Sequence, residues 1–148
     1  MRISTTTHYA SRLLLDLAQN AGDAPVSASK LATNTGIPVK FVEKIVRPLK
    51  AAGFVKSVRG ALGGHYLGCR PHDITLGSVV RLMDGGIRLA QCASGNERCN
   101  TCHDCRTQEV WQSVTRTLER ELDSITLADM LGSHRPGCWK MDLTGTEG

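Results

Sequence analysis

The chain has 148 residues, of which 41% are hydrophobic and 22% charged, and its formal net charge is +4. This length suits one compact domain, or a small domain with an extended element. No apolar run reaches about 18 residues, so the sequence predicts no transmembrane helix. Because the N-terminus lacks the apolar core of a signal peptide, we expect a cytoplasmic protein whose six cysteines are thiols rather than disulfides.

Positive charge is concentrated in the first half of the chain. Residues 1–70 contain ten Lys/Arg and three Asp/Glu, a net charge of +7, whereas residues 71–148 contain eight and eleven, a net charge of −3. A basic half is what nucleic-acid binding requires, because phosphate contacts supply most of the non-specific affinity. Aromatic residues make up only 4% of the chain, which argues against a protein that stacks single-stranded bases.

Three helices are predicted in the basic half. Apolar residues recur at helical spacing from residue 5 to about residue 21, and the Ser4 hydroxyl can cap the first free N–H groups. Ser27 is expected to cap a second, short helix that ends at Gly36, and Pro38 is expected at the first position of a third. The third helix carries apolar residues on one side, namely Val42, Ile45, Val46, Leu49 and Ala52.

The other side of the third helix is almost entirely cationic, and Pro48 is expected to kink this helix without ending it. A short helix, a tight turn and a second helix with a basic outer face form a helix-turn-helix, whose second helix enters the major groove. We therefore expect DNA contacts from both helices. The candidate DNA-binding residues are Ser29, Lys30, Lys40, Phe41, Glu43, Lys44 and Arg47.

Two short β-prone runs follow, over residues 54–58 and 65–67, with a glycine-rich segment between them. Together they predict a β-hairpin, and a hairpin after a helix-turn-helix is a wing. Arg59 at the tip of this wing suits a narrow minor groove, whose negative potential attracts a guanidinium group.

The second half of the chain predicts further helices. Ile74-Thr75-Leu76 is expected to open one helix, and Ile125-Thr126-Leu127 repeats the same capping chemistry before a last turn. Between them, a long helical pattern carries apolar residues on one side, namely Val110, Trp111, Val114, Leu118 and Leu122. We expect the same helix of a second subunit to cover this side in a two-fold homodimer. The alternative is that Trp111 and its neighbours pack back on their own domain.

Four of the cysteines fall within fourteen residues, from Cys92 to Cys105, at spacings C-x6-C-x2-C-x2-C. This segment contains almost no apolar residue, so hydrophobic packing cannot order it. Thiolates at C-x2-C spacing can converge on one metal centre, and both zinc and iron–sulfur clusters use this arrangement. The sequence therefore predicts a metal site in this loop, and the spacing by itself is compatible with either zinc or an iron–sulfur cluster.

These features in combination resemble the IscR/NsrR (Rrf-two) family of bacterial transcription regulators over about residues 1–131. The matching segments are Met1-Arg2-Ile3 leading to Tyr9-Ala10, Val58-Arg59-Gly60 followed by Gly63-Gly64, both Ile-Thr-Leu segments and three spaced cysteines before Trp111. The resemblance implies a winged-helix dimer, held by a long helix, with an iron–sulfur cluster in the loop before that helix. It also implies that the state of the cluster controls operator binding, with relief of repression as the expected outcome.

By position, Cys92, Cys99 and Cys105 match the family's three cluster cysteines, and Cys102 is additional. Some members use a histidine as fourth ligand where this chain has Gln108. In the nitric-oxide-sensing branch, an acidic residue at the position of His8 reaches the partner's cluster. The fourth ligand is therefore open between Cys102 and the partner's His8, and we prefer His8 because it would couple the cluster directly to the DNA-binding domain.

The expected fold is mainly α, with a winged helix-turn-helix domain and two-stranded wing over residues 1–86. We expect this domain to be followed by a cluster-binding loop over 87–106 and by a long C-terminal dimerisation helix with its closing turn over 107–131. A flexible tail over 132–148 is expected at the end. The expected cofactor is one iron–sulfur cluster per subunit, 4Fe–4S in preference to 2Fe–2S, which senses redox state, nitric oxide or iron–sulfur status. The expected partner is double-stranded operator DNA.

Two alternatives come from other classes of protein. One is a DNA-binding protein with a structural four-cysteine zinc site. The other is a small electron-transfer protein, which would not need a basic helix-turn-helix and a wing. No nucleophile–base or carboxylate pair has catalytic spacing, so we expect neither an enzyme nor an organic small-molecule substrate.

Overall fold

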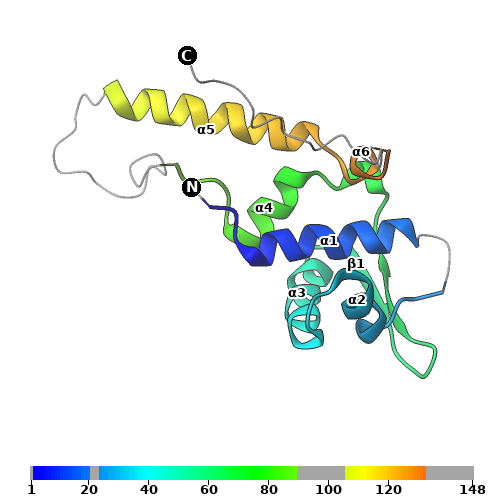
Figure 1. Ribbon diagram of the computed structural model, residues 1–148. Helices are drawn as coiled ribbons and strands as arrows, with labels where there is room; N and C mark the ends of the chain where they lie inside the picture. The colour runs from blue at the N-terminus through cyan, green and yellow to red at the C-terminus, as the bar shows by residue number, and fades with distance from the viewer. Residues whose placement is uncertain (1, 21–23, 90–105, 133–148) are drawn as a thin grey trace, which may run out of the picture.

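The computed structural model describes residues 2–20, 24–89 and 106–132. Figure 1 shows α1 in the middle of the molecule, with α2, α3 and the hairpin on one side and α4 and α5 on the other. This arrangement confirms the expected mainly helical fold with a two-stranded wing. The elements in chain order are α1 (Thr5–Gln19), α2 (Ala28–Thr35), α3 (Val39–Ala51), β1 (Val55–Val58), β2 (Gly64–Leu67), the 3-10 turn η1 (Pro71–Asp73), α4 (Leu76–Asp84), α5 (Arg106–Ser124) and α6 (Leu127–Gly132).

Side-chain caps and a left-handed glycine set the bounds of the first two helices. The Ser4 hydroxyl accepts a hydrogen bond from the N–H of Thr7 at 3.1 Å, and the Ser27 hydroxyl accepts one from the N–H of Lys30 at 3.2 Å. Gly36, with a φ of 68°, ends α2 as predicted. Helix α1 ends at Gln19, and its C-cap Asn20 donates to the carbonyl of Asp16 from both its backbone N–H and its side-chain amide.

Helix α3 is amphipathic, and its buried residues are Val42, Ile45, Val46 and Leu49. The helix continues through Pro48 for three more residues, so the prediction that this proline does not end the helix is confirmed. Two details differ from the expectation. Pro38 is the N-cap and Val39 the first helical residue, and Ala52 is an exposed C-cap because the chain turns away at Gly53, whose φ is 80°.

The wing is an antiparallel hairpin that is tied to the segment before α2. Val55 pairs with Leu67, and Val58 pairs with Gly64. His65 and Val26 exchange two backbone hydrogen bonds of 2.8 Å, so the hairpin gains an isolated bridge beside β2. A side chain at residue 64 would place its Cβ 2.6 Å from the carbonyl carbon and oxygen of Val26, and this approach therefore requires glycine.

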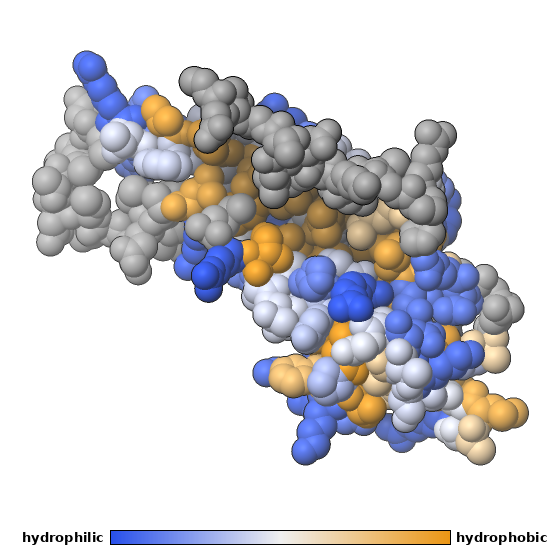
Figure 2. Space-filling view, viewed as in Figure 1, coloured by the Kyte–Doolittle hydropathy of each residue, from blue (hydrophilic) through white to orange (hydrophobic). Residues whose placement is uncertain are grey.

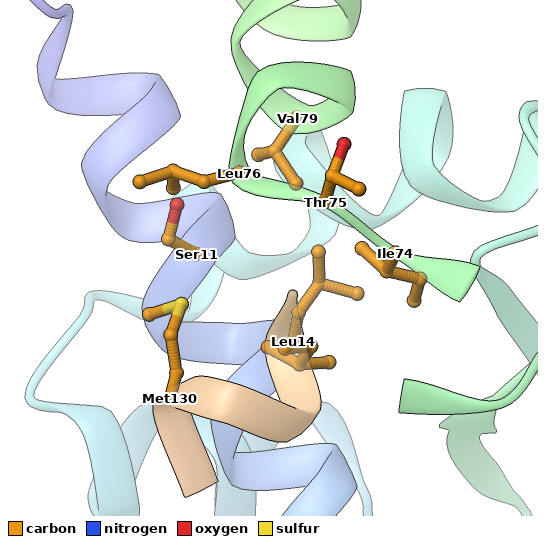
Figure 3. Close-up of a pocket in the computed structure, with 8 residues that line it drawn as sticks. Ser11, Leu14, Ile74, Thr75, Leu76, Val79 and Met130 are labelled. Atoms are coloured by element: carbon orange, nitrogen blue, oxygen red, sulfur yellow. The ribbon is translucent and has the colours of Figure 1, made fainter. Parts of the chain in front are cut away.

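The main core joins α1 to both halves of the chain. Figure 3 shows Leu14 of α1 near Ile74, which lies just before α4, and Met130 of α6 on the other side of Leu14. Leu14, Ile74 and Leu127 are all buried. The cavity among these side chains is about 10 Å³, roughly room for one water molecule, so the junction is closely packed. Helix α6 therefore packs into the same core as α1.

The C-terminal end of α5 contacts α4 through an ion pair. The Arg81 guanidinium donates to both carboxylate oxygens of Asp123, at 3.1 and 2.6 Å. This bond holds the pKa of Asp123 below its usual value. A Cβ at residue 77 would lie 2.0 Å from a carboxylate oxygen of Asp123, so a side chain there would have to displace this carboxylate. No helix within the described ranges is both long and apolar enough to cross a membrane.

Candidate functional site

The outward side of α3 presents the predicted recognition residues to solvent. Lys40, Glu43, Lys44 and Arg47 are all exposed. Phe41 differs from them, because its ring lies 6.3 Å from that of Tyr9 in an edge-on arrangement with an interplanar angle of 73°. Half of Phe41 nevertheless stays exposed. This residue therefore connects α3 to α1 as well as contributing to the surface.

The remaining predicted DNA-binding residues lie on neighbouring elements. Ser29 and Lys30 are exposed in the first turn of α2, and Arg59 is exposed directly after β1. Figure 1 shows α2, α3 and the wing on the same side of α1, away from α5. The tertiary structure thus brings the cations of three separate segments to one side of the molecule.

The wing contains a histidine with a shifted pKa, in the strand pair next to the last one before the tip. The hydroxyl of Ser57 and Nδ1 of His65 are 2.8 Å apart across the hairpin. Burial lowers the pKa of His65, the nearby Lys50 lowers it further, and Glu43 acts in the opposite direction. The neutral imidazole is therefore the favoured form of this β2 residue.

Helix α1 is clamped to the turn of the helix-turn-helix by Arg12. Its guanidinium donates to the carbonyl oxygen of Thr35, the last residue of α2. Asp16, one turn later, accepts a hydrogen bond of 3.2 Å from the side chain of Asn34. A cation at the C-terminal end of a helix is favourable for the helix dipole. No sequence pattern predicts this clamp, since its partners are distant in the chain.

A second long-range contact links α1 to the end of α4. The N–H and the hydroxyl of Ser4 donate to the two carboxylate oxygens of Asp84, at 3.1 and 2.5 Å. Burial opposes ionisation of Asp84, but the hydrogen bonds from Ser4 and Thr7 outweigh it and hold the pKa of this carboxyl below its usual value. Asp84 is the last residue of α4. The cap of α1 therefore depends on the segment that leads toward the cysteine-rich loop.

Of the predicted metal ligands, only His8 lies within the described residues, where it is exposed on α1. Cys92, Cys99, Cys102 and Cys105 lie outside them, and the described part of the chain contains no group of three or more His, Cys, Asp or Glu that could hold a metal. Four closely spaced thiols have the donor chemistry that an iron–sulfur cluster or zinc requires. Cys105 directly precedes Arg106, the first residue of α5, so the last of these four cysteines is next to this helix in the chain.

His8 also lines an open, mostly apolar groove of about 370 Å³ on the α5 side of α1. Helices α1, α4, α5 and α6 all contribute to the groove. Its lining residues include Ile3, Leu15, Leu76, Val80, Leu122 and Met130. Arg12 is at the same groove, so the α1–α2 clamp lies next to it.

The N-terminal half of α5 leaves large apolar side chains uncovered. Val110 is 60% exposed, Trp111 45% and Val114 44%, while Leu118 and Leu122 are partly buried. Figure 2 shows hydrophobic surface along this helix. Within the described residues, Trp111 is therefore only partly covered by its own domain.

Comparison with known proteins agrees with this geometry. A family model described as Rrf2, iron-dependent transcriptional regulator, matches residues 3–133. The rrf2 protein of Nitratidesulfovibrio vulgaris is 34% identical over 131 residues, which cover 88% of this chain and 87% of that protein.

Two solved structures share both fold and sequence with the chain. The IscR of T. potens has a TM-score of 0.74 at 34% identity and covers 100% of this chain and 94% of its own. CymR (YrzC), the global cysteine regulator of B. subtilis, has a TM-score of 0.72 at 30% identity, with 89% and 97% covered. These relatives are transcription regulators rather than enzymes. The chain belongs to the Rrf2 family of winged-helix, DNA-binding transcription regulators.

Proposed function

We propose that this regulator is a homodimeric repressor whose binding to double-stranded operator DNA is controlled by one iron–sulfur cluster per subunit. The observation that carries the proposal is the junction between Cys105 and Arg106, where a four-cysteine loop runs directly into the first turn of α5. Any change in how the thiols are held would act on the base of that helix. Similarity to an IscR supports a cluster in this position.

Cys92, Cys99 and Cys105 would hold the cluster, with the partner's His8 or Cys102 as fourth ligand. When bound, the cluster would supply a redox-active centre that oxidants or nitric oxide can attack. We favour 4Fe–4S over 2Fe–2S. The alternative is a structural zinc site on the same cysteines, in which the metal senses nothing.

The apolar side of α5 supports dimerisation. Val110, Trp111 and Val114 are exposed on a helix that also contributes to the groove beside α1. In a two-fold dimer, each α5 would cover the groove of the other subunit, so both apolar surfaces would be buried at once. An exposed apolar patch of this kind, rimmed by polar residues, is typical of an interface between proteins.

This packing would also bring the partner's loop to His8. His8 lines the groove, and the partner's Cys105 precedes the first residue of the helix that would enter it. The proposed dimer would therefore place His8 where it could act as the fourth ligand of the partner's cluster. His8 is preferred to Cys102 on this ground.

Contacts of α1 provide the route from the loop to DNA. Arg12 joins α1 to the end of α2, and Tyr9 contacts Phe41 of α3. Asp84 connects the approach to the loop with the cap of α1. A rearrangement of the loop that displaces α1 would therefore change the placement of α2 and α3, the helices expected on the major groove.

The test is anaerobic purification followed by an absorbance spectrum with iron, sulfide and zinc counts. A brown protein with iron and sulfide, which enriches specific duplexes from a random pool and loses that affinity when the cluster is destroyed, supports the proposal. A colourless protein with stoichiometric zinc supports the structural-metal alternative, because zinc has no visible transitions.

The dimer has its own test. Trp111→Glu should convert the protein to a monomer in sedimentation, because the partner would have to bury a charge. Ser113→Glu, which adds the same charge at an exposed position on the same helix, should leave the dimer intact. A monomeric wild-type protein contradicts the proposed interface.

A further inference from the structure

The tip of the wing is a four-residue turn that exposes one large apolar side chain. The N–H of Gly63 donates to the carbonyl oxygen of Gly60 at 3.0 Å, which closes the turn around Ala61 and Leu62. Gly60 has a φ of 117°, and a Cβ at residue 63 would lie 2.2 Å from the carbonyl oxygen of Val58. Leu62 is 91% exposed, more than any other large hydrophobic residue in the described part of the chain.

The fold gives no reason for a leucine at this position. The glycines on either side already satisfy the backbone, and turn positions are usually occupied by small or polar residues. At 91% exposure, Leu62 covers no core residue, so replacing it should not affect folding. A single exposed apolar residue is ordinary on a protein surface, so what points to a partner is where Leu62 lies, at the tip of the hairpin, and the charges beside it.

The charges around Leu62 identify the chemistry of that partner. Residues 54–69 include Lys56 and Arg59 but no aspartate or glutamate. Lys56 and Tyr66 pair on the solvent-facing side of the hairpin and are both exposed. A basic strip with an apolar tip suits a polyanion with a recess that can cover the leucine, and a nucleic-acid groove offers both.

The position of the tip identifies the same partner. Figure 1 shows the end of the hairpin on the side of α2 and α3 and away from α5, where the second subunit is expected. Figure 2 shows hydrophobic surface at the projecting end of the hairpin. The apolar tip therefore lies on the same side of the molecule as the recognition residues.

We propose that Leu62 is a specificity-determining residue, which enters the minor groove beside Arg59 and wedges against a deformable base step. The proposal rests on the function proposed above, since it requires the wing to meet duplex DNA. Leucine is one of the side chains that proteins insert between base steps to kink DNA. Pyrimidine–purine steps unstack most easily, so Leu62 selects such a step without a hydrogen bond to any base.

The geometry of the turn fits this role. The closed turn presents only Ala61 and Leu62 at the tip, and the minor groove of B-form DNA is about 6 Å wide. Because the Gly60–Gly63 hydrogen bond holds the turn before binding, little conformational entropy is lost when the leucine is buried. Arg59 precedes the turn and is drawn to the negative potential of the same groove.

The experiment uses the full chain, purified anaerobically, and a duplex that the wild-type protein enriches from a random pool. Affinity is measured against salt, and DNA bending by energy transfer between dyes at the two ends. Leu62→Ala should weaken binding roughly tenfold, because a buried leucine side chain is lost. It should also reduce the bend and leave the salt dependence unchanged, since no phosphate contact is removed.

Matched variants separate the possible outcomes. Leu62→Met keeps an apolar side chain and should retain both affinity and bend. Replacing the pyrimidine–purine step in the duplex should weaken DNA binding by the wild type but not by Leu62→Ala. Unchanged affinity and bend in Leu62→Ala overturn the proposal while operator binding stands. If Leu62→Ala loses affinity without a change in bend, Leu62 does not act as a wedge. If Leu62→Ala changes the sedimentation of the protein and not its DNA binding, the proposal is also wrong. Failure of the wild type to enrich any duplex counts against the proposed function itself.

Discussion

Thr75 and Thr126 lie opposite each other in an isolated antiparallel bridge, although 51 positions separate them in the chain. The N–H of Leu76 donates to the carbonyl oxygen of Ile125, and the N–H of Leu127 donates to that of Ile74, both at 2.8 Å. Each threonine also caps a helix, Thr75 for α4 and Thr126 for α6. The two Ile-Thr-Leu segments are thus two caps joined back to back.

This bridge makes Thr75 a point where three interactions meet. Its hydroxyl accepts from the N–H of Ser78 at 3.1 Å and faces the Asp123 carboxylate at 3.4 Å. Thr75→Ala should lower the free energy of unfolding by about 1 kcal/mol, the usual cost of a lost N-cap. Urea denaturation measures this change. Thr117→Ala, at an exposed position inside α5, is the control and should change stability by much less.

A side chain at residue 77 should destabilise the contact between α4 and α5, because Gly77 faces Asp123. In Gly77→Ala the new methyl group would displace the carboxylate and break its hydrogen bonds with Arg81. We expect a loss of about 1–3 kcal/mol in the free energy of unfolding, as for other overpacked contacts. Gly132→Ala is the matched control, since a Cβ there meets nothing within 4 Å. Equal stability of the two variants would contradict the close α4–α5 contact.

Arg59 should contribute to DNA affinity through charge. Arg59→Ala should weaken binding to a duplex enriched by the wild type and reduce the slope of log affinity against log salt by about one. Binding isotherms over a range of salt concentrations measure both quantities. Arg116→Ala removes a cation from α5 on the opposite side of the molecule and should leave the slope unchanged. A wild-type slope in Arg59→Ala would remove Arg59 from the interface.

The fourth cluster ligand can be assigned with a pair of variants. His8→Ala should lose or destabilise the cluster and uncouple it from operator affinity, whereas Cys102→Ala should keep both. Cys99→Ala, which removes one of the three family cysteines, should abolish iron binding and serves as the positive control. Anaerobic spectra with iron counts measure retention. If Cys102→Ala loses the cluster and His8→Ala keeps cluster and regulation, the cross-subunit ligand is wrong.

His65 should make the stability of the wing depend on pH. The pKa of this histidine is lowered below its usual 6.5, first by burial, so the unfolded chain binds the proton more readily than the folded one. Stability is therefore full above about pH 6.5 and falls as the pH drops toward the lowered pKa. In His65→Gln this pH-dependent part of the stability should disappear. It is measured as the difference between the denaturation midpoints of the wild type and His65→Gln over a range of pH. A constant difference between pH 5 and 8 would contradict the shift.

Local chemistry allowed the sequence to predict most of the helices and the wing. Ser4, Ser27 and Thr75 cap helices because a hydroxyl reaches an N–H only three residues away. Gly36 and Gly85 end helices because they adopt a left-handed conformation that other residues avoid. The cationic side of α3 followed in the same way from helical spacing. These features depend on neighbours in the chain, and a pattern of residues is enough to reveal them.

Contacts between distant segments were decided only by the tertiary structure. Ser4 and Asp84 are 80 residues apart, Arg12 and Thr35 are 23 apart, and Gly77 is recognisable as closely packed only beside Asp123. No periodicity encodes such pairs, because they depend on how packed helices cross. The sequence by itself determined which surfaces are basic, apolar or rich in thiols. The packing of α1 against α2, α4 and α6 decided which of those surfaces face the same side and which contacts join them.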